Sequence, residues 1–334
     1  MDTALETFDA VLPHGITLAC RAAGPAGADA PRVLLLHGFP EAAFAWEGVM
    51  QRLQGRVRCV APDLRGFGGS SAPVDIGAYR AAVLMDDLEA LIDRLGGPVD
   101  LLVAHDWGGA LAWNLAAQRP ALVRRLLIVN SPHPAAFLRE LRHNPAQREA
   151  SAYMNFLCRP DAAALLEQDG YARLWPFFER MGASAWLDEA MRERYRLVWA
   201  CGLEGALNYY RASPLKPPLA GAPDRLARIE LPDEAVTVRV PTTVLWGLDD
   251  TALLPGLLDS LDRWVPDLRM VRVSGASHWI VHERPDLVVA EIERALASRC
   301  AEWDPASGPP SDPAGVHPDL PNGSAGAARL RDVR

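Results

Sequence analysis

A carboxylate stands at a strand-to-helix junction of the sequence, in the segment Ala104-His105-Asp106-Trp107-Gly108. A strand-like run at 99–102 precedes it and a helix-like stretch at 110–118 follows it. A nucleophile flanked in this way by a small residue and a glycine is typical of the nucleophile elbow, a sharp turn that presents the side chain at the top of a sheet. Hydrolases usually place serine there, so an aspartate predicts an ester formed on the enzyme's own carboxylate. The alternative is a helix N-cap, which aspartate also favours.

Two later segments offer partners for this carboxylate. The segment VLWGLDD ends a strand-like run and contains Asp250, with Asp249 as a less favoured substitute. The segment VSGASHW places His278 in the loop after the last strand-like run. The chain order nucleophile, acid, histidine is one in which catalytic triads occur. Taken singly, the aspartates could be helix caps and the histidine a solvated loop residue.

An earlier segment, His37-Gly38-Phe39-Pro40, follows another strand-like run. The backbone N–H of Phe39 can join the N–H of Trp107 in an oxyanion hole beside the elbow. Without the elbow, the same segment would be an ordinary glycine-proline turn.

Short apolar runs alternate with longer stretches of helical spacing over most of the chain. This alternation predicts an α/β fold with a mostly parallel central sheet and helices on both faces. Several runs are continuously apolar, as strands buried on both sides are. The expected strands lie at 32–36, 57–61, 100–103, 126–129, 242–246 and 268–273.

The alternation stops between 132 and 240, where helix-like segments rich in aromatic residues predominate, at 153–157, 162–166, 172–181 and 187–208. We therefore predict a sheet core in two parts, 1–131 and 241–297, with a helical cap or lid at 132–240. Residues 298–334 are rich in proline, glycine and serine and have few apolar side chains, a composition that predicts a disordered tail.

The composition excludes several classes of protein. With 334 residues, 49% of them hydrophobic, the chain can bury a substantial core. A net charge of -8 without a block rich in lysine and arginine argues against nucleic acid or an anionic membrane as partner. The five cysteines are scattered and fit neither a disulfide framework nor a zinc site. The acidic N-terminus is unlike a signal peptide, so we expect a cytoplasmic protein.

Together these motifs resemble the α/β-hydrolase superfamily, specifically its soluble epoxide hydrolase branch, which is related to the haloalkane dehalogenases. The resemblance rests on HGFP, HDWGG, WGLDD, SHW and DLRGFGGS at 63–70, and it extends from Leu12 to Leu296. It implies an α/β-hydrolase fold with an inserted helical lid, in agreement with the organisation inferred from the alternation.

In the resembled family, two lid tyrosines hold the epoxide oxygen. Tyr153, seven residues before Pro160, and Tyr210, in LNYYRASP, stand at the matching positions. The alternative for each is a core aromatic whose hydroxyl is bonded to backbone. The expected substrate-binding residues, around a largely apolar cavity, are His37, Pro40, His105, Met154 and Trp175.

The resemblance implies conversion of an epoxide to a vicinal diol. Asp106 would attack a ring carbon while the tyrosines protonate the alkoxide, and His278, held by Asp250, would activate the water that cleaves the ester. The expected partners are a small hydrophobic epoxide and water, with no cofactor and no metal. The sequence does not indicate the oligomeric state.

The main alternative is a haloalkane-type dehalogenase, which uses the same aspartate nucleophile. Trp107 would suit a halide donor, but Phe39 stands where such enzymes often place an asparagine as the second donor. The two lid tyrosines favour an epoxide. A non-catalytic ligand receptor on the same fold is a weaker alternative, since no member of the catalytic set is missing.

Overall fold

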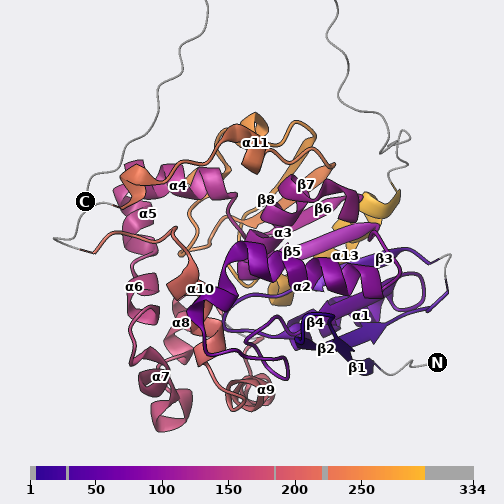
Figure 1. The fold of residues 1–334 in the computed structure, drawn as a ribbon, viewed down its shortest axis with the longest axis horizontal. Helices are drawn as coiled ribbons and strands as arrows, with labels where there is room; N and C mark the ends of the chain where they lie inside the picture. The colour runs from indigo at the N-terminus through magenta and orange to yellow at the C-terminus, as the bar shows by residue number, and fades with distance from the viewer. Residues whose placement is uncertain (1–4, 28–29, 184–185, 220–224, 298–334) are drawn as a thin grey trace, which may run out of the picture. The chain divides into compact units, whose positions relative to one another are not determined.

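An eight-stranded sheet forms the centre of the protein (Figure 1). The computed structural model describes residues 5–27, 30–183, 186–219 and 225–297. The strand order is β1-β2-β4-β3-β5-β6-β7-β8, with the pairs β1·β2 and β2·β4 antiparallel and all other pairs parallel. The strands are β1 Glu6–Val11, β2 Thr17–Ala23, β3 Arg32–Leu36, β4 Arg58–Pro62, β5 Leu101–His105, β6 Leu126–Val129, β7 Thr242–Gly247 and β8 Leu268–Val273.

The inner strands confirm the predicted parallel sheet. Strands β3, β6 and β8 begin and end at the predicted residues, and β4, β5 and β7 differ from the prediction by one or two residues. Every residue of β5 and of β6 is buried, because helices cover both faces of the sheet there. The prediction missed β1 and β2 at the antiparallel edge. Most residues of β1 are exposed, and partly buried residues alternate with buried ones in β2, so neither strand is buried as a continuous run.

Helices cover the sheet on both faces. Met50 of α1 and Val288 of α13 belong to the hydrophobic cluster of one face, and Leu84 of α2 and Leu111 of α3 belong to the cluster of the other. The helices of the core are α1 Glu47–Leu53, α2 Ala81–Arg94, α3 Asp106–Gln118, α12 Ile280–Glu283 and α13 Pro285–Ala297.

The segment between β6 and β7 contains no strand in its described residues. Its helices are α4 Pro134–His143, α5 Pro145–Ala150, α6 Tyr153–Leu157, α7 Ala162–Tyr171, α8 Trp175–Arg180, α9 Glu189–Trp199, α10 Glu204–Ala212 and α11 Asp233–Val236. Figure 1 shows α6 to α9 on one side of the sheet, with α10 between them and the core helices.

The helices of this segment correct the prediction in detail. The helix expected over 187–208 is two helices, α9 and α10, because Gly202 adopts a left-handed conformation, φ 111°, and ends the first one. Helices α4 and α5 were not predicted. The predicted disordered tail, 298–334, lies outside the described residues. In the part of the chain that is described, every helix is too short or too polar to cross a bilayer.

Candidate active site

Asp106 occupies a sharp turn between β5 and α3. It is the first residue of α3 and has a backbone φ of 49°, a value that residues other than glycine rarely adopt. Two glycines allow the surrounding backbone to approach. A Cβ atom on Gly38 would stand 2.1 Å from Oδ1 of Asp106, and one on Gly108 would stand 2.5 Å from the carbonyl oxygen of His37. The predicted elbow is therefore present, and its backbone is strained at the residue that carries the carboxylate.

The carboxylate of Asp106 contacts both a backbone donor and a histidine. The N–H of Phe39 donates to Oδ1 at 2.7 Å. Oδ2 lies 3.9 Å from Nε2 of His278. The hydroxyl of Ser131 donates to the backbone carbonyl of Asp106 at 2.6 Å, which fixes the turn from the end of β6. One carboxylate oxygen is thus held at an amide while the other faces an imidazole.

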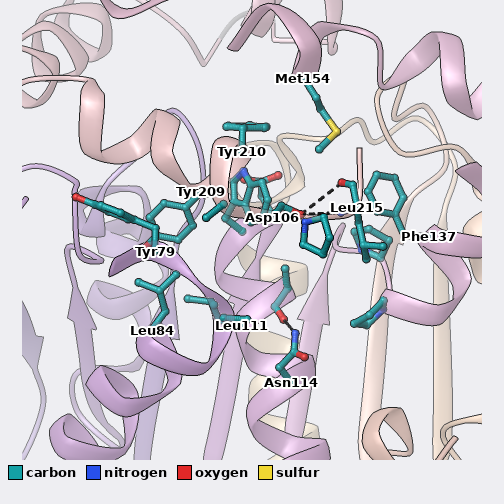
Figure 2. A pocket seen from close by; sticks show the side chains of 18 of the residues that line it. Tyr79, Leu84, Asp106, Leu111, Asn114, Phe137, Met154, Tyr209, Tyr210 and Leu215 are labelled. Atoms are coloured by element: carbon teal, nitrogen blue, oxygen red, sulfur yellow. Dashed lines mark hydrogen bonds between the residues drawn. The ribbon is translucent and has the colours of Figure 1, made fainter. Parts of the chain in front are cut away.

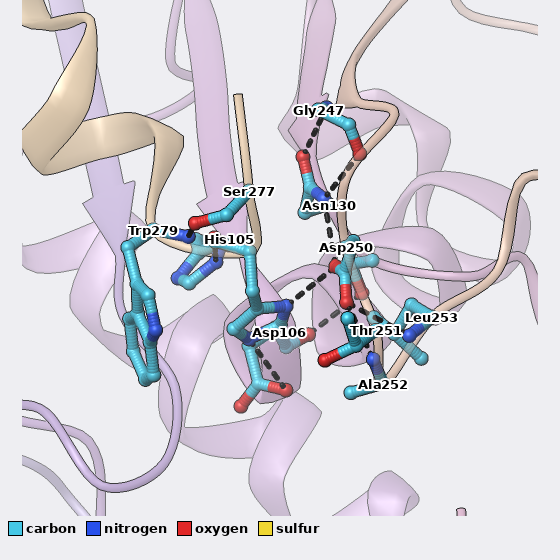
Figure 3. A network of polar contacts seen from close by, with 12 residues as sticks. His105, Asp106, Asn130, Gly247, Asp250, Thr251, Ala252, Leu253, Ser277 and Trp279 are labelled. Atoms are coloured by element: carbon cyan, nitrogen blue, oxygen red, sulfur yellow. Dashed lines mark hydrogen bonds and ion pairs between the residues drawn. The ribbon is translucent and has the colours of Figure 1, made fainter. Parts of the chain in front are cut away.

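Asp250 pairs with His278 and accepts several hydrogen bonds, and Figure 3 shows the residues that surround this carboxylate. Nδ1 of His278 and Oδ2 of Asp250 are 2.7 Å apart, and both side chains are buried. Oδ1 of Asp250 accepts the N–H groups of Ala252 and Leu253 at 2.8 and 2.9 Å. The neighbouring Asp249 is exposed, so the structure places Asp250 in the triad geometry and leaves Asp249 outside it.

Asn130 completes the set of donors to Asp250. Its amide nitrogen donates to Oδ2 of Asp250 at 2.7 Å, and its amide oxygen accepts the N–H of Gly247 at 2.8 Å. Figure 3 shows Asn130 between Gly247 and Asp250. The sequence analysis treated no residue at the end of β6 as part of the site, although that position, like those after β5 and β7, lies at the carboxyl edge of the sheet.

A second anchor holds the loop that carries His278. The carboxylate of Glu283 accepts the backbone N–H of Ser277 at 2.8 Å and its hydroxyl at 2.6 Å. Because Ser277 immediately precedes the histidine, this clamp limits how far the imidazole can move relative to Asp106. The sequence analysis missed Glu283 as well, and its only signal was its place in the helix that follows the histidine.

The charges of His278 and Asp250 stabilise one another. Burial disfavours the protonated form of His278, but the carboxylate of Asp250 outweighs burial and raises the pKa of His278 to about 9, with a further contribution from Asp106. Burial alone would raise the pKa of Asp250, whereas the positive charge and hydrogen bond of His278 hold it below its usual value. The free site therefore favours an imidazolium between two carboxylates at neutral pH.

A cavity of about 470 Å³ opens above the carboxylate (Figure 2). Asp106 and Trp107 line it from the core, and Tyr153, Met154 and Tyr210 line it from the helical segment. The two tyrosines that the resemblance singled out thus line the same cavity as Asp106.

The two tyrosine rings lie near one another, with centroids 6.3 Å apart, and the ring of Tyr210 packs edge-on against Trp107 at 4.9 Å. Burial raises the pKa of Tyr153, and the negative charge of Asp106 raises it further. Burial likewise raises the pKa of Tyr210. Both phenols are therefore protonated at neutral pH and able to donate hydrogen bonds into the cavity.

Four of the five predicted substrate-binding residues do not line the cavity, and only Met154 does. His37 is buried, and its Nε2 accepts the N–H of Leu64 at 3.0 Å. The carbonyl of Pro40 accepts the indole N–H of Trp199 at 2.7 Å.

The other two residues are also turned to structural contacts. Nε2 of His105 lies 2.9 Å from the carbonyl oxygen of His278. The ring of Trp175 packs against Trp199, with centroids 4.8 Å apart, and the guanidinium of Arg192 stands 4.6 Å from its centre. The side chain of His105 therefore packs within the core, and that of Trp175 packs within the helical segment.

The remaining walls of the cavity come from residues that the sequence analysis did not single out. Phe137 on α4 and Leu215 after α10 stand on one side of Asp106, and Tyr79 and Leu84 stand on the other (Figure 2). Tyr209, whose hydroxyl donates to the carbonyl of Arg65 at 3.0 Å, also lines the cavity. No local motif marks such residues, because each reaches the cavity from a different element.

The chain resembles known proteins along most of its length. A family model described as the alpha/beta hydrolase fold matches residues 31–285. An AB hydrolase superfamily protein of Bacillus subtilis is 33% identical over 279 residues, which make up 82% of this chain and 92% of that protein. Epoxide hydrolase 3 of Xenopus tropicalis is 34% identical over 268 residues, or 77% of this chain and 69% of that protein.

A solved structure is similar to this chain as well. The structure of an epoxide hydrolase from metagenomes of hot environments matches with a TM-score of 0.79 and 37% identity, and the match covers 89% of this chain and 100% of the other. The family match includes both the sheet from β3 onward and all the helices between β6 and β7.

Proposed function

The chain belongs to the α/β-hydrolase superfamily, in its epoxide hydrolase branch, and on this basis we propose that it hydrolyses an epoxide to a vicinal diol through an ester on Asp106. The observation that carries the proposal is that the elbow carboxylate shares one cavity with two protonated tyrosines and lies 3.9 Å from a histidine paired with a second carboxylate.

Ring opening requires an anionic nucleophile and a proton donor on opposite sides of the epoxide. A free oxygen of Asp106 attacks a ring carbon, the bond from that carbon to the ring oxygen breaks, and the alkoxide takes a proton from Tyr153 or Tyr210. The tyrosinate left behind recovers its proton from solvent. An apolar cavity suits this step because it excludes water, and hydrogen bonds to the developing charge are stronger where water is excluded.

Ester formation changes the charge next to the histidine. Once Asp106 is an ester, it no longer contributes the negative charge that helps to raise the pKa of His278. The pKa of the imidazole then falls, and its neutral form becomes available as a general base. The first step therefore prepares the base that the second step needs.

Hydrolysis of the ester completes the cycle. Nε2 of His278 removes a proton from water as the water oxygen bonds to Cγ of Asp106, and the N–H of Phe39, already 2.7 Å from Oδ1, donates to the resulting oxyanion. The tetrahedral intermediate releases the diol, whose oxygen takes the proton back from the imidazole. We include the N–H of Trp107 as a second donor to the oxyanion and the helical segment 132–240 as the lid that carries the tyrosines.

The proposal is tested by following oxygen from labelled water into the enzyme. After a single turnover of styrene oxide in ¹⁸O water, we expect the label in the carboxyl group of the peptide that contains Asp106, because water attacks Cγ of that residue. The Asp106→Asn variant should lose about 10⁴-fold or more in turnover. An unlabelled peptide together with labelled diol would contradict the ester and indicate direct hydration.

A parallel measurement distinguishes epoxide hydrolysis from the related dehalogenase reaction. Wild-type protein is incubated with styrene oxide and with a bromoalkane, and diol and bromide are quantified separately. We expect diol as the main product, because the tyrosine hydroxyls serve an alkoxide leaving group. Bromide without diol would favour the dehalogenase.

A further inference from the structure

Two charged residues occur among the described residues that line the cavity. One is the nucleophile Asp106, and the other is Arg80. The rest of the wall is formed by aromatic, aliphatic and proline side chains, with Asn114 and Ser213 as further polar residues. A single cation in a mostly apolar wall limits which ligands fit. An apolar group of a ligand gains no favourable interaction with the guanidinium, whereas an anionic group gains a charge-assisted hydrogen bond.

Arg80 is the N-cap residue of α2 and lines the cavity. It directly follows Tyr79, whose ring is 5.7 Å from that of Tyr209, and Tyr209 is in turn 5.7 Å from Trp107. Figure 2 places Tyr79 and Leu84 on the same side of Asp106. Arg80 lines the cavity and follows Tyr79 directly, so we infer that it meets the part of a substrate that extends beyond Asp106 on this side.

The guanidinium of Arg80 is exposed and makes no hydrogen bond or ion pair with any described residue. Its neighbour Arg65 is different: it is buried, donates to both carboxylate oxygens of Asp87 at 2.7 and 2.5 Å, and donates to the carbonyl of Ala78 at 2.9 Å. Arg65 has a structural role that uses its donors, whereas the donors of Arg80 are available to a ligand.

We propose that Arg80 is a specificity-determining residue that selects epoxides carrying a carboxylate on the substituent that extends toward α2. The inference rests on the proposed epoxide hydrolysis and adds a substrate class to it. The planar guanidinium can bind a carboxylate through two parallel hydrogen bonds. The net charge of -8 repels anions in general, so an anionic substrate requires a local cation of this kind.

The expected size of the effect follows from the exposure of Arg80. A charged hydrogen bond at a solvated rim is partly screened, so we expect a change of about threefold to tenfold in kcat/KM. The same screening makes the effect sensitive to salt, and it should shrink as the ionic strength rises.

The test compares a homologous series of ω-epoxy carboxylates with their methyl esters. Each pair shares the epoxide and chain and differs in the terminal charge. kcat/KM is measured for wild type, Arg80→Gln and Arg80→Lys at low and at high salt. Arg272→Gln serves as the control, because Arg272 is an exposed arginine on β8 that does not line the cavity and its removal changes the net charge equally.

We expect wild type to prefer at least one acid over its ester, Arg80→Gln to lower kcat/KM for that acid about threefold to tenfold, and the esters to be unaffected. Arg80→Lys should retain part of the preference, and Arg272→Gln all of it. If both series are hydrolysed and the acid-to-ester ratio is the same in wild type and Arg80→Gln, the inference is wrong and the proposed function stands. If no epoxide is hydrolysed, the proposed function fails and the inference falls with it.

Discussion

Two histidines four residues apart in the chain, His278 and His282, each pair with a buried carboxylate, and the two pairs have different surroundings. His278 lies 2.7 Å from Asp250 and 3.9 Å from Asp106, which lines the cavity. His282 lies 2.6 Å from Glu41, which also accepts the hydroxyl of Tyr195 at 2.6 Å. The first pair is adjacent to a cavity, and the second joins α12 of the core to α9 of the helical segment.

The comparison shows that a buried ion pair does not by itself identify a catalytic site. Trp186 stacks on His282 with ring centroids 4.1 Å apart. Neither pair lines the cavity itself, but His278 lies 3.9 Å from Asp106, which does line it. A substrate can therefore reach Asp106 beside the first pair but not the second. In the first pair the histidine has a free Nε2 directed at a carboxylate that can become an ester, and this is what links its proton to a reaction.

The largest loss of activity is expected from removing the hydroxyls of the two tyrosines that line the cavity. The variant with both Tyr153→Phe and Tyr210→Phe should lose about 10⁴-fold in kcat/KM for epoxides, because each hydroxyl donates to the developing alkoxide. Diol formation and the thermal unfolding midpoint are measured on the same preparation. A stable variant that forms diol at the wild-type rate would show that both residues are only packing aromatics.

Breaking the first pair should have the next largest effect. His278→Gln removes the general base but leaves Asp106 and both tyrosines in place, so turnover should fall about 10²- to 10⁴-fold while the ester accumulates. Mass spectrometry should detect a mass increment on the peptide that contains Asp106. Rapid, steady turnover in this variant would remove His278 from the mechanism.

The pH dependence of wild type provides a control for this prediction. The pKa of His278 is raised to about 9 in the free site, so the imidazole is largely protonated below that pH and becomes neutral above it. Ester formation removes one of the charges that raise this pKa. The rate of ester hydrolysis in single turnovers should therefore increase with pH and level off at a pH below about 9. A rate that decreases over this range would contradict a histidine base.

The smallest effect on the reaction is expected from the same substitution in the second pair. His282→Gln should lower the free energy of unfolding by about 1–3 kcal/mol, because Glu41 is buried and loses one of its hydrogen-bond partners. Diol formation per folded molecule should remain within about threefold of wild type, since His282 does not contact the cavity. Accumulation of the ester in His282→Gln would show that both pairs take part in the reaction.

The sequence predicted the residues that depend on local pattern and strand order. Asp106 follows from the elbow motif, and His278 and Asp250 follow from their places after the later strands. Tyr153 and Tyr210 came from the resemblance to a family, and the structure places both of them at the cavity. The cytoplasmic location, the absence of a cofactor and the role of the helical segment as a lid stay predictions.

The sequence did not predict which neighbours of the motifs face the cavity. His105 precedes the nucleophile, yet the positive φ of Asp106 turns the chain there and the imidazole contacts the backbone of His278 instead. His37 and Pro40 were assigned to the substrate because they belong to a motif, and Trp175 because it is an aromatic residue of the expected lid. The direction of a side chain depends on the packing of distant elements, which a single stretch of sequence does not encode.

The sequence by itself determined the parallel sheet, the elbow and the chain order of the reactive groups, because apolar periodicity and turn residues act over short distances. The tertiary structure decided how the cavity is bounded. It brings Arg80, Phe137 and Leu215 to the same space as Asp106 from three separate elements. It also decides which of two chemically similar histidine–carboxylate pairs lies beside the carboxylate of Asp106, since that placement depends on contacts between residues far apart in the chain.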